Sequence, residues 1–364
     1  MSENTKLTVS ASPHIQGSAT VTGIMLDVII ALIPAAFAGV AVFGIRAAAV
    51  IAITTAATVL IEYLWQVLFH REKTAGNLSG VVTGLLLSFC LPATAPFWVC
   101  LTGAFIATLV KQLFGGYGKN FLNPALTARL VLTLLFTTAL SDFTAPAKNA
   151  ADAVSTATPL AQLSAIDLSG NINMQLGSLI TDGDLPGFIN MLFGVRSGCI
   201  GETCAAALII GGIYLILRGV ISFVLPCVYI LTTTLFMLFA SGFNPLFTTY
   251  EILSGGLLLA AFFMLTDPST SPKGLKWKLI CGAACGIATA LIRLFTPLPE
   301  GIGITVLLMN AACVIIEKKQ LNFTPPVIRK KTEADTQEEM ATEALCAPEA
   351  AVNEDTEKEA GSSS

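Results

Sequence analysis

The chain has 364 residues, of which 54% are hydrophobic and only 12% are charged. Soluble domains carry about 25% charged residues, so this composition excludes an ordinary water-soluble domain and indicates an integral membrane protein. The net charge of −4 comes mostly from one end, since residues 332–364 hold ten Asp or Glu and one Lys. Such a segment cannot bury enough apolar surface to offset its ordering entropy. We therefore expect an acidic, disordered tail and no nucleic-acid partner.

Apolar stretches long enough to cross a bilayer fill most of the chain. A transmembrane helix needs about 20 mostly apolar residues, and ten stretches of about this length occur, at 23–43, 46–69, 79–95, 97–113, 124–140, 201–217, 219–240, 250–266, 276–295 and 301–316. This pattern predicts an all-α polytopic membrane protein with about ten transmembrane helices. Residues 1–22 are polar and lack a cleavable signal peptide. The predicted parts are an N-terminal segment (1–22), five helices (23–140), a polar loop (141–200), five more helices (201–317) and the tail (318–364).

The distribution of Lys and Arg predicts how these helices are oriented. With residue 1 in the cytoplasm and ten helices threaded in turn, 16 Lys or Arg fall inside and 4 fall outside. An excess of positive charge is typical of cytoplasmic loops in membrane proteins. We therefore expect both ends of the chain in the cytoplasm and the polar loop 141–200 on the outer face.

The two halves share a sequence pattern. Residues 80–96 and 256–272 are both apolar helical stretches that close on Pro-x-Thr-x-Pro, at a constant offset of 176. Each belongs to the third predicted helix of its half. Because each half has an odd number of helices, the second copy would enter the membrane upside down. The pattern predicts a 5+5 inverted repeat, an architecture typical of transporters; a chance likeness of two proline-rich helix ends is the alternative.

Ionisable residues inside the predicted helices are candidates for chemistry, since charge in a bilayer is costly. Asp27 and Glu62 could each serve an ion path, or each could pair neighbouring helices. The chain has only two histidines and no CxxC pattern, so no metal site is expected. Cys281 and Cys285 lie one helical turn apart without an accompanying His or third Cys. We interpret them as small buried apolar side chains.

The loop 141–200 contains one motif that points to a cofactor. It reads Asp152-Ala-Val-Ser-Thr156-Ala-Thr158-Pro-Leu160, which by composition alone is an exposed Ser/Thr/Pro-rich segment. A threonine hydroxyl, however, suits attachment through a stable phosphoester. The motif resembles the flavin-attachment sequence of a family shared by the D subunit of the Rnf complex and the B subunit of the sodium-translocating NADH:quinone reductase. The resemblance implies that Thr158 holds FMN covalently through its phosphate. Thr156, where the family most often has Gly, is the competing acceptor.

Further motifs extend the resemblance over nearly the whole chain, in the family's order and spacing. They are Ser12-Pro13-His14, residues 24–28, a glycine-rich stretch at 115–125, residues 263–272, Pro299-Glu300-Gly301 and Met309-Asn310. The glycine-rich stretch and the Thr266-Asp267-Pro268 turn each have two interpretations that the sequence leaves open. Each is a tight structural turn, or a place where the backbone approaches a cofactor or an ion closely.

The resemblance implies a flavoprotein subunit of the ion-translocating ferredoxin:NAD⁺ oxidoreductase (Rnf) complex in a bacterial inner membrane. Flavins serve electron transfer, so the subunit would relay electrons while the complex, a translocase, exports Na⁺ or H⁺. The implied partners are the A, B, C, E and G subunits of the Rnf complex and the flavin transferase that attaches FMN. A second flavin, riboflavin held without a covalent bond among the helices, is implied as well.

The chain would not complete this reaction alone, since it has no nucleotide-binding fingerprint and no iron–sulfur cysteine pattern. Two alternatives remain open. The B subunit of the quinone reductase differs in its electron donor and acceptor, although the length of this chain favours the Rnf member. A channel or secondary transporter without redox chemistry would suit an inverted repeat equally, because a fold alone does not decide function.

Overall fold

The computed structural model describes residues 20–70, 75–113, 120, 122–143, 157–168, 170–272, 274–296 and 301–323. Within these ranges every regular element is a helix, and an isolated β-bridge joins Pro92 to Cys199. The chain divides into two compact units, residues Met1–Glu317 and Lys318–Ser364. The predicted all-helical class is confirmed for the described residues, whereas residues 324–364 of the predicted tail lie outside them.

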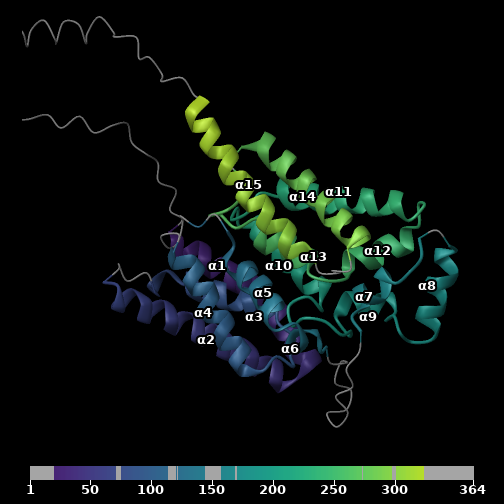
Figure 1. The fold of residues 1–364 in the computed structure, drawn as a ribbon, viewed down its shortest axis with the longest axis horizontal. Helices are drawn as coiled ribbons and strands as arrows, with labels where there is room; N and C mark the ends of the chain where they lie inside the picture. The colour runs from purple at the N-terminus through teal and green to yellow at the C-terminus, as the bar shows by residue number, and fades with distance from the viewer. Residues whose placement is uncertain are drawn as a thin grey trace, which may run out of the picture. The chain divides into compact units, whose positions relative to one another are not determined.

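The helices of the first half follow the predicted order (Figure 1). Their bounds are α1 (Val21–Phe43), α2 (Ile45–Leu68), η1 (Ala75–Asn77), α3 (Ser79–Phe89), α4 (Phe97–Leu113), α5 (Pro124–Leu135) and α6 (Thr137–Ser141). Local chemistry explains the ends of several of them. The Thr20 hydroxyl accepts the first free N–H of α1, from Gly23. Gly44 takes a positive φ of 74° between α1 and α2. Asn123 caps α5, and Pro124 occupies its first position.

The third predicted helix, 79–95, is shorter than expected. Helix α3 ends at Phe89, ahead of Pro92, and the chain then continues without regular structure. Its free carbonyl groups are paired within the protein, because Phe89 and Leu91 accept hydrogen bonds from the N–H groups of Gly201 and Ile200, each at 3.0 Å. Irregular backbone at membrane depth requires such pairing.

The second half departs from the predicted helices most clearly at 250–266. Its elements are α10 (Ala205–Leu217), α11 (Val224–Ala240), α12 (Pro245–Leu253), α13 (Leu257–Leu259), the π-helical η2 (Ala260–Met264), α14 (Leu275–Phe295) and α15 (Ile302–Phe323). The helix predicted over 250–266 is divided, since α12 and the α13–η2 segment meet at 64°, as in a broken span or a re-entrant loop. Ser254 is extended and Gly255 has φ of 64°, a conformation that glycine adopts without strain.

Three described helices, α1, α2 and α14, are long and apolar enough to cross a membrane, and the bent α12–η2 pair makes a fourth if it counts as one span. The apolar helices α3, α4, α5, α10, α11 and the described part of α15 are shorter. These lengths identify a membrane protein. The number of described helices that are long enough to span a membrane is smaller than the ten predicted from hydropathy.

Helices α1 and α10 join the two halves and run antiparallel to each other. Gly211 lies so close to α1 that a Cβ atom there would be 2.3 Å from the carbonyl oxygen of Ala31. Gly39, farther along α1, would likewise bring a Cβ atom to 2.7 Å from the Ile200 carbonyl, just before α10. Residues later in α1 therefore contact residues earlier in the α10 segment, so the two helices are antiparallel.

The described part of the loop 141–200 is folded. It forms α7 (Pro159–Ser164), α8 (Ile172–Thr181) and α9 (Phe188–Phe193), and it buries Leu163, Leu176, Leu185 and Met191. The exposed surface segment expected from composition is thus replaced, from residue 157 onward, by short helices whose buried side chains belong to the same hydrophobic core as the longer helices. Residues 144–156 of this loop lie outside the described residues.

The close approach of α1 and α10 gives a stability prediction. Gly211→Ala should lower the free energy of unfolding by about 1–3 kcal/mol, because backbone atoms must move to admit the methyl group. Gly177→Ala is the matched control, since nothing lies within 4 Å of the Cβ position in α8, and it should be neutral or stabilising. Thermal unfolding in detergent measures both; equal effects would contradict the packing described above.

Candidate functional site

Thr158 stands at the start of α7, where its hydroxyl has a defined position. The residue is the N-cap of α7, and its Oγ1 accepts a hydrogen bond from the Ala161 N–H at 3.3 Å. Thr158 is half-buried, whereas Pro159 and Leu160 behind it are buried. The predicted acceptor thus lies at the boundary between a packed helix and the solvent, with an ordered side chain. Its competitor Thr156 lies outside the described residues.

Residues 196–203 form the other wall of the small depression that Thr158 lines. The Ser197 hydroxyl donates to the Ala157 carbonyl at 2.8 Å and so ties this wall to the residue before Thr158. Arg196 is buried, with its guanidinium donating to the carbonyl groups of Glu202 and Thr203. Burial lowers the pKa of Arg196 to about 10, although the charges of Glu202 and Cys204 oppose that shift. Arg196 therefore keeps its positive charge at neutral pH.

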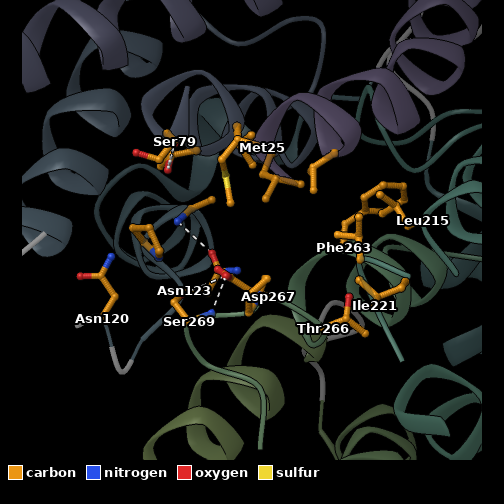
Figure 2. A pocket seen from close by; sticks show the side chains of 18 of the residues that line it. Met25, Ser79, Asn120, Asn123, Leu215, Ile221, Phe263, Thr266, Asp267 and Ser269 are labelled. Atoms are coloured by element: carbon orange, nitrogen blue, oxygen red, sulfur yellow. Dashed lines mark hydrogen bonds between the residues drawn. The ribbon is translucent and has the colours of Figure 1, made fainter. Parts of the chain in front are cut away.

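A second pocket lies where the two halves meet at their interrupted helices. Its cavity has a volume of about 50 Å³. Figure 2 shows polar side chains on one side of it, those of Ser79, Asn120, Asn123, Asp267 and Ser269. The other side is mostly apolar and is formed by Leu215, Ile221 and Phe263, with the Thr266 hydroxyl beside them. Concave sites with an apolar wall and a few convergent polar groups typically bind small molecules.

This pocket brings together the two turns that the sequence left open. Asn123, at the end of the glycine-rich stretch, donates from Nδ2 to the Met264 carbonyl at 3.5 Å, just before the Thr266-Asp267-Pro268 turn. Asn120 and Asn123 line the pocket together with that turn. Residues 114–119 and 121 lie outside the described residues. The described residues Asn120 and Asn123 and the Thr266-Asp267-Pro268 turn therefore lie on a pocket wall, and Asn123 also makes a structural contact.

Glu62 is the acid of a fully buried ion pair. Lys111 Nζ lies 2.8 Å from Glu62 Oε1 and 2.9 Å from Oε2, and it also donates to the Ser79 hydroxyl at 2.8 Å. Both charged side chains are about 2% exposed. The Asp267 carboxylate attracts the same ammonium group. The pair joins α2 to α4 at the edge of the pocket, so Glu62 serves at least to hold these helices together.

Asp27 also pairs helices. Its carboxylate accepts hydrogen bonds from the Tyr214 hydroxyl at 3.0 Å and from Arg218 at 3.2 and 3.3 Å. These contacts fasten the start of α1 to the end of α10. The helix-pairing interpretation of Asp27, one of two drawn from the sequence, accounts for its contacts.

Comparison with known proteins places this geometry in a family. The family model described as “NQR2, RnfD, RnfE family” matches residues 8–323. The chain belongs to that family. It is 40% identical over 338 residues to the D subunit of the Na⁺-translocating ferredoxin:NAD⁺ oxidoreductase complex of Acetobacterium woodii, covering 90% of this chain and 98% of the relative.

Other members of the NQR2, RnfD, RnfE family show the range of its functions. The D subunit of the proton-translocating ferredoxin:NAD⁺ oxidoreductase complex of Clostridium ljungdahlii is 38% identical, covering 88% of this chain and 95% of the relative. The B subunit of the Na⁺-translocating NADH-quinone reductase of Stutzerimonas stutzeri is 34% identical, covering 72% of this chain and 64% of the relative. The resemblance stated from sequence motifs is confirmed, and these relatives are subunits of ion-translocating redox complexes.

Sequence reasoning missed one charged site of this family member. Arg293 of α14 and Glu251 of α12 form a buried ion pair, with Nη1 and Oε2 2.9 Å apart. Both residues lie inside predicted helices, at 250–266 and 276–295, yet only Asp27 and Glu62 stand among the ionisable candidates from the sequence. An acid and a base on separate helices show no periodicity that would reveal their pairing.

The spacing of cysteines in the sequence also does not reveal a third cysteine near Cys281. Cys313 of α15 brings its Sγ to 3.1 Å from Cys281 Sγ, and both side chains are buried. Cys281 and Cys285 therefore do have a third cysteine near them, contrary to the expectation from sequence spacing. Helix packing rather than sequence spacing supplies it.

The buried pair Glu62–Lys111 gives a second stability prediction. Lys111→Met should lower the free energy of unfolding by about 3–5 kcal/mol, because it leaves a buried carboxylate without its partner. Arg218→Met removes a cation whose side chain is 58% exposed and should change it by at most about 1 kcal/mol. Thermal unfolding of the two variants in detergent compares them; an equal loss of stability would contradict the assigned burial.

Proposed function

We propose that the chain is the membrane flavoprotein subunit of an Rnf-type complex and that it carries FMN on Thr158. The position of the Thr158 hydroxyl is the observation that carries this proposal. Thr158 Oγ1 is the acceptor in the capping hydrogen bond from the Ala161 N–H. A phosphoester on this oxygen replaces only the hydroxyl hydrogen, so the capping bond can remain. The half-buried side chain leaves the oxygen within reach of a transferase from the solvent side.

The surroundings of Thr158 fit a phosphate group. The buried, charged Arg196 lines the same depression, and a fixed cation favours the single negative charge of a nearby phosphodiester. When bound, FMN supplies reversible electron transfer. The protein supplies the rest: α7 fixes the attachment point, and Arg196 and Ser197 fix the wall beside it.

The lining of the pocket between the halves fits the second, non-covalent flavin. The amides of Asn120 and Asn123 and the hydroxyl of Ser269 can donate to and accept from the heteroatoms of an isoalloxazine ring. Phe263 and Ile221, on the opposite wall, can cover its apolar edge. The open space inside the pocket is about 50 Å³, below the about 300–1,000 Å³ typical of small-molecule sites, so the walls would move apart around the bound ring. We assign riboflavin to this pocket.

An inverted repeat with ten spans and both termini in the cytoplasm is part of the proposal. The antiparallel packing of α1 on α10, the first helix of each half, supports it. A second support comes from two glycines at the repeat offset of 176 residues. A Cβ atom on Gly80 would lie 2.5 Å from a Glu62 oxygen, and one on Gly256 would lie 2.6 Å from a Glu202 oxygen. Each half thus places a carboxylate against the same point of its third helix.

The transported ion is Na⁺ or H⁺, and identity to relatives does not choose between them. The relative named as Na⁺-translocating and the one named as proton-translocating are 40% and 38% identical to this chain. Both are named as subunits of ferredoxin:NAD⁺ oxidoreductase complexes and are matched over nearly their whole length, whereas the quinone-reductase relative is matched over 64% of its length. This coverage favours ferredoxin:NAD⁺ oxidoreduction as the activity of the complex, with the other Rnf subunits and the flavin transferase as partners.

Covalent flavin is the direct test. Co-expression with a flavin transferase should give a flavin-fluorescent band of the full-length chain in a denaturing gel. Thr158→Ala should abolish this fluorescence, because no hydroxyl remains to form the ester. Thr156→Ala is the matched control and should leave the band bright. A wild-type band without fluorescence, or a fluorescent Thr158→Ala band, would contradict the assignment of FMN to Thr158.

Riboflavin in the second pocket has an independent test. Asn120→Leu should reduce the riboflavin released from the purified chain by heat, measured by chromatography, since a pocket amide is replaced by an apolar group. The covalent fluorescence should persist in this variant. Thr158→Ala should show the reverse, with riboflavin retained and covalent fluorescence lost. Simultaneous loss of both flavins in either variant would contradict two separate sites.

A further inference from the structure

We propose that Arg293 is a positioning residue for the flavin-bearing Thr158, acting through the bend between α12 and α13. The proposal rests on the proposed function in that Thr158 is taken to carry FMN. Three steps lead from one residue to the other: the hydrogen bonds of Arg293, the packing of Gly255, and the place of Leu160 in α7.

Arg293 binds the backbone at the bend. Its Nη1 donates to the Glu251 carbonyl at 2.6 Å and to the Glu251 carboxylate at 2.9 Å, while Nη2 donates to the Ser254 carbonyl at 3.1 Å. The last carbonyl groups of a helix lack partners within that helix, and Arg293 supplies partners to two of them. All three residues are buried, so water does not substitute.

The bend in turn contacts α7. Gly255, with its φ of 64°, lies between Arg293 and Leu160. A Cβ atom on Gly255 would be 3.2 Å from Arg293 Nη2 on one side and 3.0 Å from Leu160 Cδ2 on the other. Leu160 is buried and follows Thr158 by two residues, and Gly255 and Thr158 line the same depression. Movement of the bend would therefore displace the first turn of α7.

The arginine side chain is needed for this contact because of its shape. A planar guanidinium reaches a carboxylate and two carbonyl groups at fixed angles, whereas a lysine ammonium is a single point of charge. Glu251 compensates the buried charge. Buried pairs of this kind often add little net stability, and a role in fixing geometry explains the pair better than a role in stability.

A spin label beside Thr158 tests the proposal without requiring a flavin. Ala157 is exposed, so Ala157→Cys, in a full-length chain with Cys227→Ser and Cys346→Ser, accepts a nitroxide reagent. In lipid nanodiscs the parent should show an immobilised spectral component. Arg293→Gln should lose this component, and so should Arg293→Lys, which keeps the charge and provides a second variant should Arg293→Gln not fold.

Two controls separate positioning from general loosening. Tyr229→Phe removes another buried hydrogen bond of α14, from the Tyr229 hydroxyl to Thr289 at 3.1 Å, and should keep the immobilised component at 157. A label at Ala52→Cys, exposed on α2, should report the same mobility in every variant. Immobilisation retained in both Arg293 variants would overturn the proposal, as would a mobile parent or an equal loss in Tyr229→Phe. A dark flavin band would instead overturn the proposed function and leave the spin-label result standing.

Discussion

An apolar medium penalises any charge or backbone polar group that lacks a partner, and the rest of this structure follows from that constraint. The carboxylates of Asp27, Glu62 and Glu251 each meet a cation on another helix, Arg218, Lys111 and Arg293. The Glu62–Lys111 and Glu251–Arg293 pairs are buried, so they contribute little net stability but are costly to break. These two pairs therefore specify that α2 neighbours α4 and α12 neighbours α14, whereas the pair between α1 and α10 includes the exposed Arg218 and is worth little.

The same constraint explains why irregular backbone is found only where protein surrounds it. The chain after α3 hydrogen-bonds to residues 200 and 201, and the end of α12 hydrogen-bonds to Arg293. Interrupted helices open space between the halves without exposing unpaired backbone to lipid. The depression beside Thr158 lies at the bend after α12, where Gly255 lines it, and the pocket with Asn123 and Asp267 on its wall lies at the turn that follows η2.

The proposed redox function would depend on elements that are not themselves redox-active. Helix α7 carries the Thr158 hydroxyl at its N-cap, and the bend at Gly255 packs beside Leu160 of α7. Because electron transfer requires cofactors at fixed positions, a covalent attachment is useful only if the attachment point is itself held. The buried contacts of Leu160 and Ser197 hold it on two sides.

Hydropathy and motif order alone determined the membrane class, most helix positions, the family and the candidate residue Thr158, because each is a local or periodic property of the chain. Tertiary structure alone decided the partners of Asp27 and Glu62, the pair Glu251–Arg293, the contact of Cys281 with Cys313, and the bend at Gly255. These depend on side chains separated by 32 to 191 residues in sequence or on a local backbone angle. One sequence offers no signal for which buried acid meets which base, since many helix packings satisfy the same hydropathy.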